Sequence, residues 1–434
     1  MLKKLFGFDP QKTTVRTELL AGLTTFLTMS YILAVNPGMF SQLDGMSAGA
    51  VFTATALAAI VGSLAMAMIG KMPFGLAPGM GLNAFFVYTV CMGMGYSWQF
   101  ALTAVFIEGL IFIVLTLSNL REAIVNAIPV SLKNAIGAGI GLFIAFIGLQ
   151  NAGIVVNNDA TLVSLGDITS GSALLGILGL IITGILVVKN VRGGLLIGIL
   201  ITTAIGVPMG LTEFKGIVSA PHSISDIFCK FEWTHIFTLD MLVVVFTFLF
   251  IDMFDTIGTL VGVCTKAKIL DADGRIPRVK EAFMADSIAT TVGACLGTST
   301  TTTYVESASG VAQGGRTGLT AFAVAVCFAI SLFFSPIFLA IPAAATAPVL
   351  VIVGLFMMSP IKNIPFDDYT ESIPAFITIV MMPMVYSISD GILLGMISYV
   401  LLNMLCMNFK RITPTMYILA VLFLLKYIFI YEAV

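Results

Sequence analysis

Charged residues are scarce in this sequence, and long apolar runs stand in their place. Asp, Glu, Lys and Arg make up 10% of the 434 residues, hydrophobic residues make up 58%, and the mean hydropathy is +1.05. Soluble domains carry about 25% charged residues, so the composition predicts a protein that crosses the lipid bilayer many times. The net charge is −2 and there is no basic tract, so nothing indicates a nucleic-acid partner.

Motifs of several other protein classes are also missing. The absence of a G-x-x-x-x-G-K-[ST] sequence argues against ATP-driven transport. The first residues lack the apolar stretch and cleavage site of a signal peptide, so we expect the first apolar run to be a retained span. His222 and His235 have no partner at a metal-ligand spacing, and neither a metal nor a cofactor is expected. The cysteines lack CxxC spacing and are interpreted as apolar packing residues: Cys91, Cys229, Cys264, Cys295, Cys327 and Cys406.

The apolar runs divide into fourteen predicted membrane elements, each needing about 20 residues when fully helical. They lie at residues 18–36, 48–69, 75–93, 98–117, 129–150, 172–188, 192–208, 240–263, 281–297, 299–314, 317–340, 342–358, 372–387 and 390–408. With a cytoplasmic N-terminus, every Lys and Arg except Lys215, Lys230 and Lys426 lies on the inner side. Positive charge concentrates on the cytoplasmic side, so this ladder predicts a multi-pass protein of the cell membrane. The apolar tail is expected to form an interfacial or half-buried helix.

The two halves of the chain resemble each other. Gly141-Leu-Phe143 recurs as Gly354-Leu-Phe356, and an offset of similar size places Asn83 opposite Glu306. Each unit holds seven predicted elements, an odd number, so the second unit must be inverted relative to the first. Inverted repeats are typical of secondary transporters.

Two of the predicted elements cannot be plain helices. The run Gly75-Leu-Ala-Pro-Gly-Met-Gly-Leu-Asn83 is broken by glycine and proline, and Thr298-Ser-Thr-Thr-Thr-Thr-Tyr-Val-Glu306 is a β-branched run that ends on a carboxylate. Irregular backbone within a membrane is tolerated only where protein or a water-filled cavity satisfies its polar groups. Interrupted segments at corresponding places in two halves indicate a transporter's substrate site.

Five carboxylates fall within the predicted spans: Glu108, Asp252, Asp255, Asp286 and Glu306. A charge at this depth costs at least ~2.5–3.5 kcal/mol, so each one needs a reason. Glu108 and Asp286 are isolated, and bonding to Ser, Thr or backbone of a neighbouring span explains them as well as function does. The other three converge on the interrupted segments, and Asp252 and Asp255 are expected to share one helix face.

These acids indicate the chemistry of the ligand. No intramembrane Lys or Arg is placed to pair with them, so at least one is expected to carry a proton part of the time, as proton symport requires. Carboxylates and the Asn83 amide accept hydrogen bonds from N–H donors and offer no cationic charge to an anion. A neutral or cationic N–H-rich solute therefore fits better. Phe85, Phe86, Tyr304 and Phe254 are either ordinary core residues or stacking partners for a flat ring.

Three stretches of the sequence resemble one known family. Pro78-Gly-Met-Gly-Leu-Asn-Ala-Phe-Phe86, Phe254-Asp-Thr-Ile-Gly-Thr-Leu260 and Gly297-Thr-Ser-Thr-Thr-Thr-Thr-Tyr-Val-Glu-Ser-Ala-Ser-Gly310 are similar to the hypoxanthine/adenine/guanine permeases. These form the AzgA-like branch of the nucleobase–cation symporters, which is related to the nucleobase/ascorbate transporters. The resemblance covers almost the whole chain, and the third stretch is highly specific.

The resemblance implies an all-α membrane protein of fourteen segments in a 7+7 inverted repeat. Segments 3 and 10 would each pair a short strand with a half-helix. The implied divisions are a cytoplasmic N-terminus (1–17), a core domain (18–118 and 240–340), a gate domain (129–208 and 342–408) and a C-terminal tail (412–434). A homodimer built through gate helices and an elevator-like movement of the core past the gate are implied as well.

The resemblance also implies roles for particular residues. Asn83, Asp252 and Glu306 look like substrate contacts, Asp255 looks necessary for transport or proton coupling, and Glu306 is a second candidate for the coupled proton. How Asp252 and Asp255 divide these roles is left open. Gly81 is expected to let the half-helix approach the ligand closely.

The implied activity is import of purine nucleobases by proton symport, and two other classes were weighed against it. An anion carrier (SulP-like) or channel on the same fold would be expected to carry a basic residue near the half-helix of segment 10, where Glu306 stands. A membrane enzyme would need His, Cys or a nucleophile–base pair within the spans, and the sequence shows none, so no catalytic residues are expected.

Overall fold

The computed structural model describes residues 2–118, 129–267 and 276–431, apart from Lys12, Ser170, Glu213, Lys215 and Pro277. Parts of the predicted inner loops, with Arg121, Lys268 and Arg275, lie outside the described residues. Seven helices of the described chain are each long and apolar enough to cross a membrane. The other predicted segments are shorter, interrupted or carry more charge.

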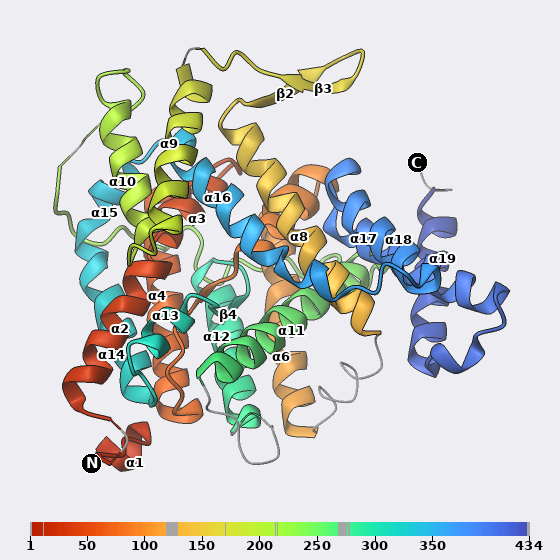
Figure 1. The fold of residues 1–434 in the computed structure, drawn as a ribbon, viewed down its shortest axis with the longest axis horizontal. Coiled ribbons are helices and arrows are strands. Elements are labelled where there is room, and N and C mark those ends of the chain that lie inside the picture. Colours follow the sequence, from red (N-terminus) through yellow and green to blue (C-terminus); the bar gives the residue numbers. More distant parts are fainter. Residues whose placement is uncertain are drawn as a thin grey trace.

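The described chain is mostly helical, and its elements follow the order of the predicted segments (Figure 1). The first unit contains α1 (Leu2–Phe6), α2 (Val15–Met29), α3 (Ile32–Phe40), α4 (Ala48–Ala65), η1 (Met66–Gly70), β1 (Leu76–Pro78), α5 (Met80–Ala84), η2 (Phe85–Gly93), α6 (Trp98–Ser118), α8 (Val130–Asn151), β2 (Val155–Asn158), β3 (Leu162–Leu165), α9 (Gly171–Val188) and α10 (Gly194–Gly206). The second unit contains α11 (Leu239–Ala267), α12 (Val279–Leu296), β4 (Thr301–Thr303), α13 (Ser307–Ala312), α14 (Gly318–Ser331), η3 (Leu332–Phe334), α15 (Ser335–Leu339), α16 (Ala343–Met357), η4 (Ser359–Asn363), α17 (Tyr369–Met384), α18 (Ile388–Leu405), η5 (Phe409–Arg411) and α19 (Pro414–Tyr431).

The predicted strands in the third and tenth segments are confirmed. β1 and β4 pair antiparallel, with Leu76 opposite Thr303 and Pro78 opposite Thr301. Side chains of neighbouring helices form hydrogen bonds with the backbone groups on the outer edge of each strand. The Ser63 hydroxyl accepts from Leu76 N of β1 at 3.1 Å, and the Thr290 hydroxyl donates to Thr301 O of β4 at 3.1 Å. Ser63 lies on α4 and Thr290 on α12, at corresponding places in the two units. Irregular backbone can therefore persist at this depth, because side chains replace the water that is missing.

The internal repeat is visible in a contact between two repeated glycines. A Cβ placed on Gly141 of α8 would collide with the carbonyl oxygen of Gly354 on α16, and a Cβ on Gly354 would collide with the carbonyl oxygen of Gly141. A second pair of equivalent contacts joins neighbouring helices in each unit. Gly198 of α10 packs on Thr183 of α9, and Gly395 of α18 packs on Thr378 of α17. Equivalent residues of the two units therefore make equivalent contacts, as an inverted repeat requires.

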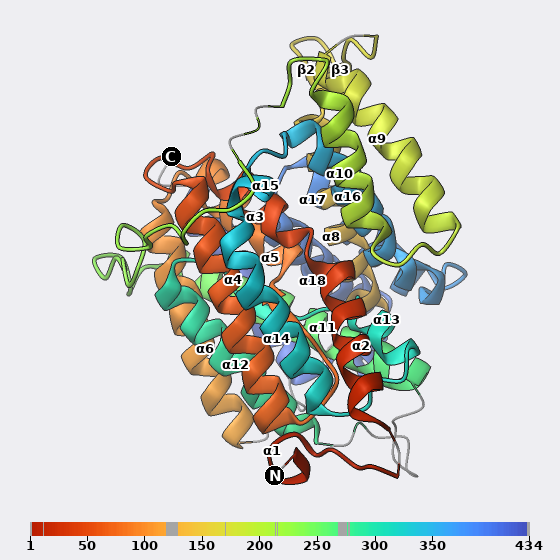
Figure 2. The same cartoon turned by 90° about the vertical axis from the view of Figure 1, so that its left-hand side faces the viewer.

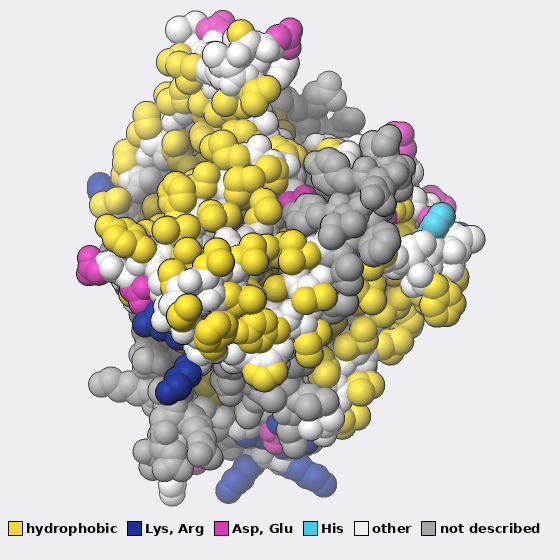
Figure 3. Space-filling view, turned by 90° about the vertical axis from the view of Figure 1, so that its right-hand side faces the viewer, with side chains coloured by type: hydrophobic (Ala, Val, Ile, Leu, Met, Phe, Trp, Pro, Cys, Tyr) yellow, Lys and Arg dark blue, Asp and Glu magenta, His cyan; other side chains and the backbone are white. Residues whose placement is uncertain are grey.

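The helices associate in two groups (Figure 2). In one group, α2, α4, α6, α12 and α14 pack against one another around the two strands. In the other group, α8, α9, α10, α16, α17 and α18 pack together. Hydrophobic side chains cover much of the described surface drawn in Figure 3, as expected for a face toward lipid.

Two features differ from the sequence-based predictions. The first segment is longer than 18–36: it runs from Val15 to Phe40 and is broken between α2 and α3 at Ser30 and Tyr31. The loop after α8 forms an unpredicted hairpin of β2 and β3. The predicted tail helix is present: α19 has 18 residues and packs against α18, and its Met416 is buried.

Candidate functional site

A pocket lies where the interrupted segments meet the second group of helices. Its cavity volume is only about 40 Å³, far below the roughly 300–1,000 Å³ typical of ligand sites, so the site is tightly packed in this structure. One side of the pocket is formed by the break in segment 1, the two interrupted segments and α11, and α16 of the second helical group closes the opposite wall. The lining residues are Tyr31, Gly79, Met80, Gly81, Asp255, Thr259, Thr303, Tyr304, Val305, Glu306, Val353 and Met357.

Glu306 lies at the start of α13, as predicted, and its side chain does not cap that helix. The Tyr31 hydroxyl donates instead to Glu306 Oε1 at 2.7 Å. Tyr31 is buried (1% exposed) beside Tyr304, with ring centroids 6.4 Å apart, and the Tyr304 hydroxyl donates to Pro78 O at 2.6 Å. The two tyrosines therefore fix the Glu306 carboxylate and the end of β1 on one wall of the pocket.

Asp255 reaches the same pocket from α11. A Cβ added to Gly79 would lie 3.8 Å from Asp255 Oδ2 and 2.8 Å from the Thr302 methyl group. A Cβ at Gly79 would collide with Thr302, so the absence of a side chain there lets the start of α5 pack closely on β4, with Asp255 at ordinary contact distance. Asp255 and Glu306 are both partly exposed, so the pocket brings together two acids from segments that are distant in the sequence.

Asp252 lies behind the pocket, although it is only three residues from Asp255. It is fully buried, and the Thr256 hydroxyl lies 3.2 Å from Asp252 Oδ1, 3.1 Å from Asp286 Oδ2 and 2.6 Å from Thr302 Oγ1. A hydroxyl has one proton to donate, and Thr302 can supply at most one more. If all three contacts are hydrogen bonds, at least one of the two carboxyl groups must itself be the donor. This cluster of Asp252, Thr256, Asp286 and Thr302 can therefore hold a proton.

Asn83 also lies off the pocket. It is fully buried on α5, where its side-chain oxygen accepts a hydrogen bond from Ser299 and its amide lies 3.4 Å from Pro78 O. Gly81 lines the pocket, and a Cβ there would lie 2.8 Å from Ile140 Cγ2 on α8. Gly81 thus allows close packing between the half-helix and the second helical group. Of the predicted site residues, Gly81, Asp255 and Glu306 share the pocket wall, and Asn83 and Asp252 stand behind it.

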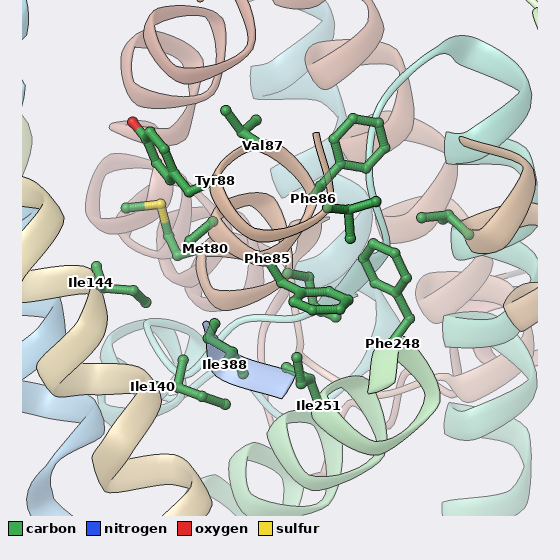
Figure 4. Close-up of a cluster of buried hydrophobic side chains, with 14 of the residues drawn as sticks. Met80, Phe85, Phe86, Val87, Tyr88, Ile140, Ile144, Phe248, Ile251 and Ile388 are labelled. Carbon is green, nitrogen blue, oxygen red and sulfur yellow. The ribbon is translucent and has the colours of Figure 1, made fainter. Parts of the chain in front are cut away.

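An apolar cluster continues along the half-helix beyond the pocket. Phe85 and Phe86 of η2 pack against Phe248 of α11, with ring centroids 4.8 and 6.4 Å apart, and Ile140 and Ile144 of α8 join the same cluster (Figure 4). Phe85 and Phe86 are fully buried core residues in this structure, whereas Tyr304 lines the pocket. The side chain of Phe254 lies outside the described residues.

Sequence reasoning missed several members of the site. Tyr31 lies in a run predicted to be continuous helix, and only the break between α2 and α3 turns its hydroxyl toward Glu306. Val353 and Met357 read as ordinary apolar residues. The sequence left open whether Glu108 and Asp286 have a structural or a functional role. In the structure, Glu108 accepts a hydrogen bond from Thr300 at 2.6 Å, and the Thr256 hydroxyl lies 3.1 Å from Asp286 Oδ2. Both acids thus make the hydroxyl contacts that the structural interpretation predicted.

Two inverted seven-segment units that meet in paired strands beside buried acids form the architecture of a secondary transporter. Residues 16–394 match a family model described as "Permease family". A putative permease of Methanocaldococcus jannaschii is 49% identical over 430 residues, covering 99% of this chain and 98% of that protein. The guanine/hypoxanthine permease PbuG of Bacillus subtilis is 46% identical, with coverages of 99% and 100%. The adenine permease AdeP of Escherichia coli is 44% identical, with coverages of 99% and 96%.

The chain therefore belongs to this permease family, and its predicted resemblance to the purine permease branch is confirmed. Solved structures with a similar fold include the transmembrane domain of the cyanobacterial bicarbonate transporter BicA, with a TM-score of 0.62 and 14% identity over 89% of this chain and 97% of that one. The murine anion transporter Slc26a9 gives a TM-score of 0.66 and 12% identity over 93% of this chain and 70% of that one. At these identities the likeness concerns the fold, and the predicted fold class is confirmed.

Proposed function

We propose that this protein imports purine nucleobases (adenine, guanine or hypoxanthine) by proton symport. The base binds between the half-helices of segments 3 and 10 and the eighth segment, α11. The observation that carries the proposal is the pocket itself, into which Asp255 and Glu306 are both partly exposed. Relatives that match nearly the whole chain are named guanine/hypoxanthine and adenine permeases, which supports the substrate class.

The pocket chemistry favours a neutral, N–H-rich ring. Carboxylates accept hydrogen bonds from N–H donors, and the Thr259 and Thr303 hydroxyls can donate or accept. The tyrosine rings and the Met357 side chain supply the apolar surface that a flat heterocycle needs. Gly79 and Gly81 line the pocket, and we propose that their lack of side chains lets the half-helix backbone lie next to the base. We assign Asn83 and Asp252 to the second layer of the site, where they support the strands and the carboxylates.

An anion carrier on this fold is the alternative, and the pocket argues against it. Among the described residues that line it, there is no lysine, arginine or histidine. Two carboxylates would repel an anion in a low-dielectric site. The similarity to anion transporters of known structure supports the fold and carries no argument about the ligand.

Proton coupling follows from the buried acids. Asp255 and Glu306 face the substrate, and the cluster around Thr256 behind them can hold a proton, so a proton can enter the site with the base. Moving one charge down ~150 mV supplies roughly 3.5 kcal/mol, enough for a few-hundred-fold gradient of a neutral solute. Asp255 and Glu306 are the proposed coupling residues.

We propose that the two helical groups are the core domain (18–118 and 240–340) and the gate domain (129–208 and 342–408). The pocket lies on their boundary, so an elevator-like movement of the core past the gate would carry the base across the membrane. We assign the N-terminus to the cytoplasm and the protein to the cell membrane, because Lys and Arg concentrate on that side. A homodimer through gate helices is part of the same proposal.

The test is uptake by a strain that lacks its own purine transport. Expression of this chain should give accumulation of labelled adenine, guanine or hypoxanthine, and a protonophore should abolish it. Glu306→Gln should lose uptake while remaining in the membrane, whereas Glu281→Gln, which removes a surface carboxylate outside the pocket, should retain it. Uptake that persists after the pH gradient and potential are collapsed would refute symport. Wild-type uptake by Glu306→Gln would refute the site.

A further inference from the structure

Two cysteines that lie far apart in the sequence meet in the structure. Cys229 belongs to the loop between α10 and α11, and Cys295 lies at the C-terminal end of α12. The backbone N–H of Cys229 donates to Cys295 O at 2.8 Å, and the two thiols interact directly. The prediction that all six cysteines are apolar packing residues is wrong for Cys229 and Cys406, which are exposed.

The separation of the two residues suits a covalent bond between their sulfur atoms. The 2.8 Å contact between Cys229 N and Cys295 O keeps the two Cα atoms no further apart than about 6.7 Å, and disulfides span Cα separations of about 4.4–6.8 Å. A hydrogen bond between the two thiols places their sulfur atoms near each other. A disulfide between these two residues is therefore within geometric reach.

The loop that carries Cys229 is held firmly against the end of α12. Ile227, two residues earlier, is fully buried and packs on Gly297, where a Cβ would lie 2.8 Å from Ile227 Cβ. Gly297 has a φ of +94° and ends α12 just before the threonine run of segment 10. Phe231 packs on Phe106 of α6, with ring centroids 4.8 Å apart. The cysteine pair is thus a fixed feature of the first helical group.

The location of the pair gives it access to an oxidant. Cys229 is exposed and Cys295 is half-buried, so a small reagent can reach the pair from the loop side. In the predicted topology this loop is on the outer side of the membrane, where disulfides form and persist.

We propose that Cys229 and Cys295 form a disulfide on the outer face of this transporter. A small disulfide RSSR accepts the two electrons: the two thiols lose two protons and two electrons to form one S–S bond, and RSSR is reduced to two RSH molecules. The bond ties the loop before α11 to the end of α12, beside the start of segment 10. Both ends lie in the same helical group, so the bond stabilises that group without linking it to α8 or α16.

The experiment counts free thiols in the full-length protein. Intact cells are treated with a membrane-impermeant disulfide, and the denatured protein is then labelled with a maleimide mass tag. We expect the wild type to take up tags at four of its six cysteines, and at all six after reduction. Cys229→Ser should take up five tags in either condition. The matched control Cys406→Ser should take up three tags when oxidised and five when reduced.

Two further measurements complete the test. Peptide mapping should recover Cys229 and Cys295 peptides as one species that is lighter by two hydrogens, and the oxidised wild type should unfold several degrees above the reduced form, a difference that Cys229→Ser should abolish. Six accessible thiols after oxidation, or a bond that forms only after the cells are permeabilised, would overturn the proposal. None of these readouts depends on the transported substrate.

Discussion

Removing a single hydroxyl at the break in segment 1 tests how the carboxylate of the site is held. Tyr31→Phe keeps the buried ring beside Tyr304 and deletes only the 2.7 Å hydrogen bond to Glu306 Oε1. In the wild type this bond fixes the carboxylate before the substrate arrives. Without it the Glu306 side chain is mobile in the empty pocket and must be ordered on binding.

The magnitude follows from the ordering cost. Immobilising one flexible side chain costs about 0.5–1.5 kcal/mol, and each 1.4 kcal/mol corresponds to a tenfold change in affinity. We therefore expect the KM for purine uptake to rise roughly 2- to 12-fold in Tyr31→Phe, with a maximal rate within about twofold of the wild type. The assay is the initial rate of labelled-purine uptake against concentration, normalised to the amount of protein in the membrane.

A matched control separates positioning from general structure. Tyr399 is another buried tyrosine whose hydroxyl donates to a glutamate, Glu371 Oε1, at 3.1 Å, and it lies on α18 away from the pocket. Tyr399→Phe should leave the KM unchanged. An unchanged KM in Tyr31→Phe, or an equal rise in both variants, would refute the reasoning.

Two further variants test the packing of the fold. Gly141→Ala should lower the stability of the purified protein by roughly 1–3 kcal/mol, because the added Cβ meets a backbone carbonyl at the α8–α16 crossing; Gly137→Ala, whose nearest neighbour would lie at 3.8 Å, should be neutral or slightly stabilising. Thermal unfolding measures both, and equal melting temperatures would contradict the role of the crossing. Glu18→Ala should cost about 1.5–3 kcal/mol, because the buried carboxylate accepts hydrogen bonds from the start of α14. The surface variant Glu281→Ala should change the melting temperature little, and the same small change in Glu18→Ala would contradict the capping role.

Much of the architecture could be predicted because its signals are local. An apolar run of sufficient length identifies a membrane helix by itself, and glycine, proline or successive β-branched residues mark where a helix cannot continue. The predicted interruption at residues 75–83 and the threonine run at 298–306 are the places where β1 and β4 form. The recurrence of Gly141 as Gly354 also indicated the internal repeat from the sequence, because small residues recur where equivalent helices of the two units cross.

The composition of the pocket could not be predicted in the same way. Asp252 and Asp255 were expected to share one face of their helix, but three residues correspond to about 300° of rotation and leave the two side chains about 60° apart. In the structure, Asp252 is fully buried in the cluster with Thr256 and Asp286, whereas Asp255 lies on the pocket wall. Tyr31 was not predicted as a site residue because the sequence around it gives no signal for the break between α2 and α3.

The amino-acid sequence alone determined the membrane class, the repeat and the two interrupted crossings, since each depends on residue type and spacing within a short window. The tertiary structure alone decided which acids share a cavity, that Tyr31 holds Glu306, and that Cys229 meets Cys295. Those contacts join residues from distant parts of the chain. They depend on how the rigid helices are rotated and offset against one another, which no short stretch of sequence records.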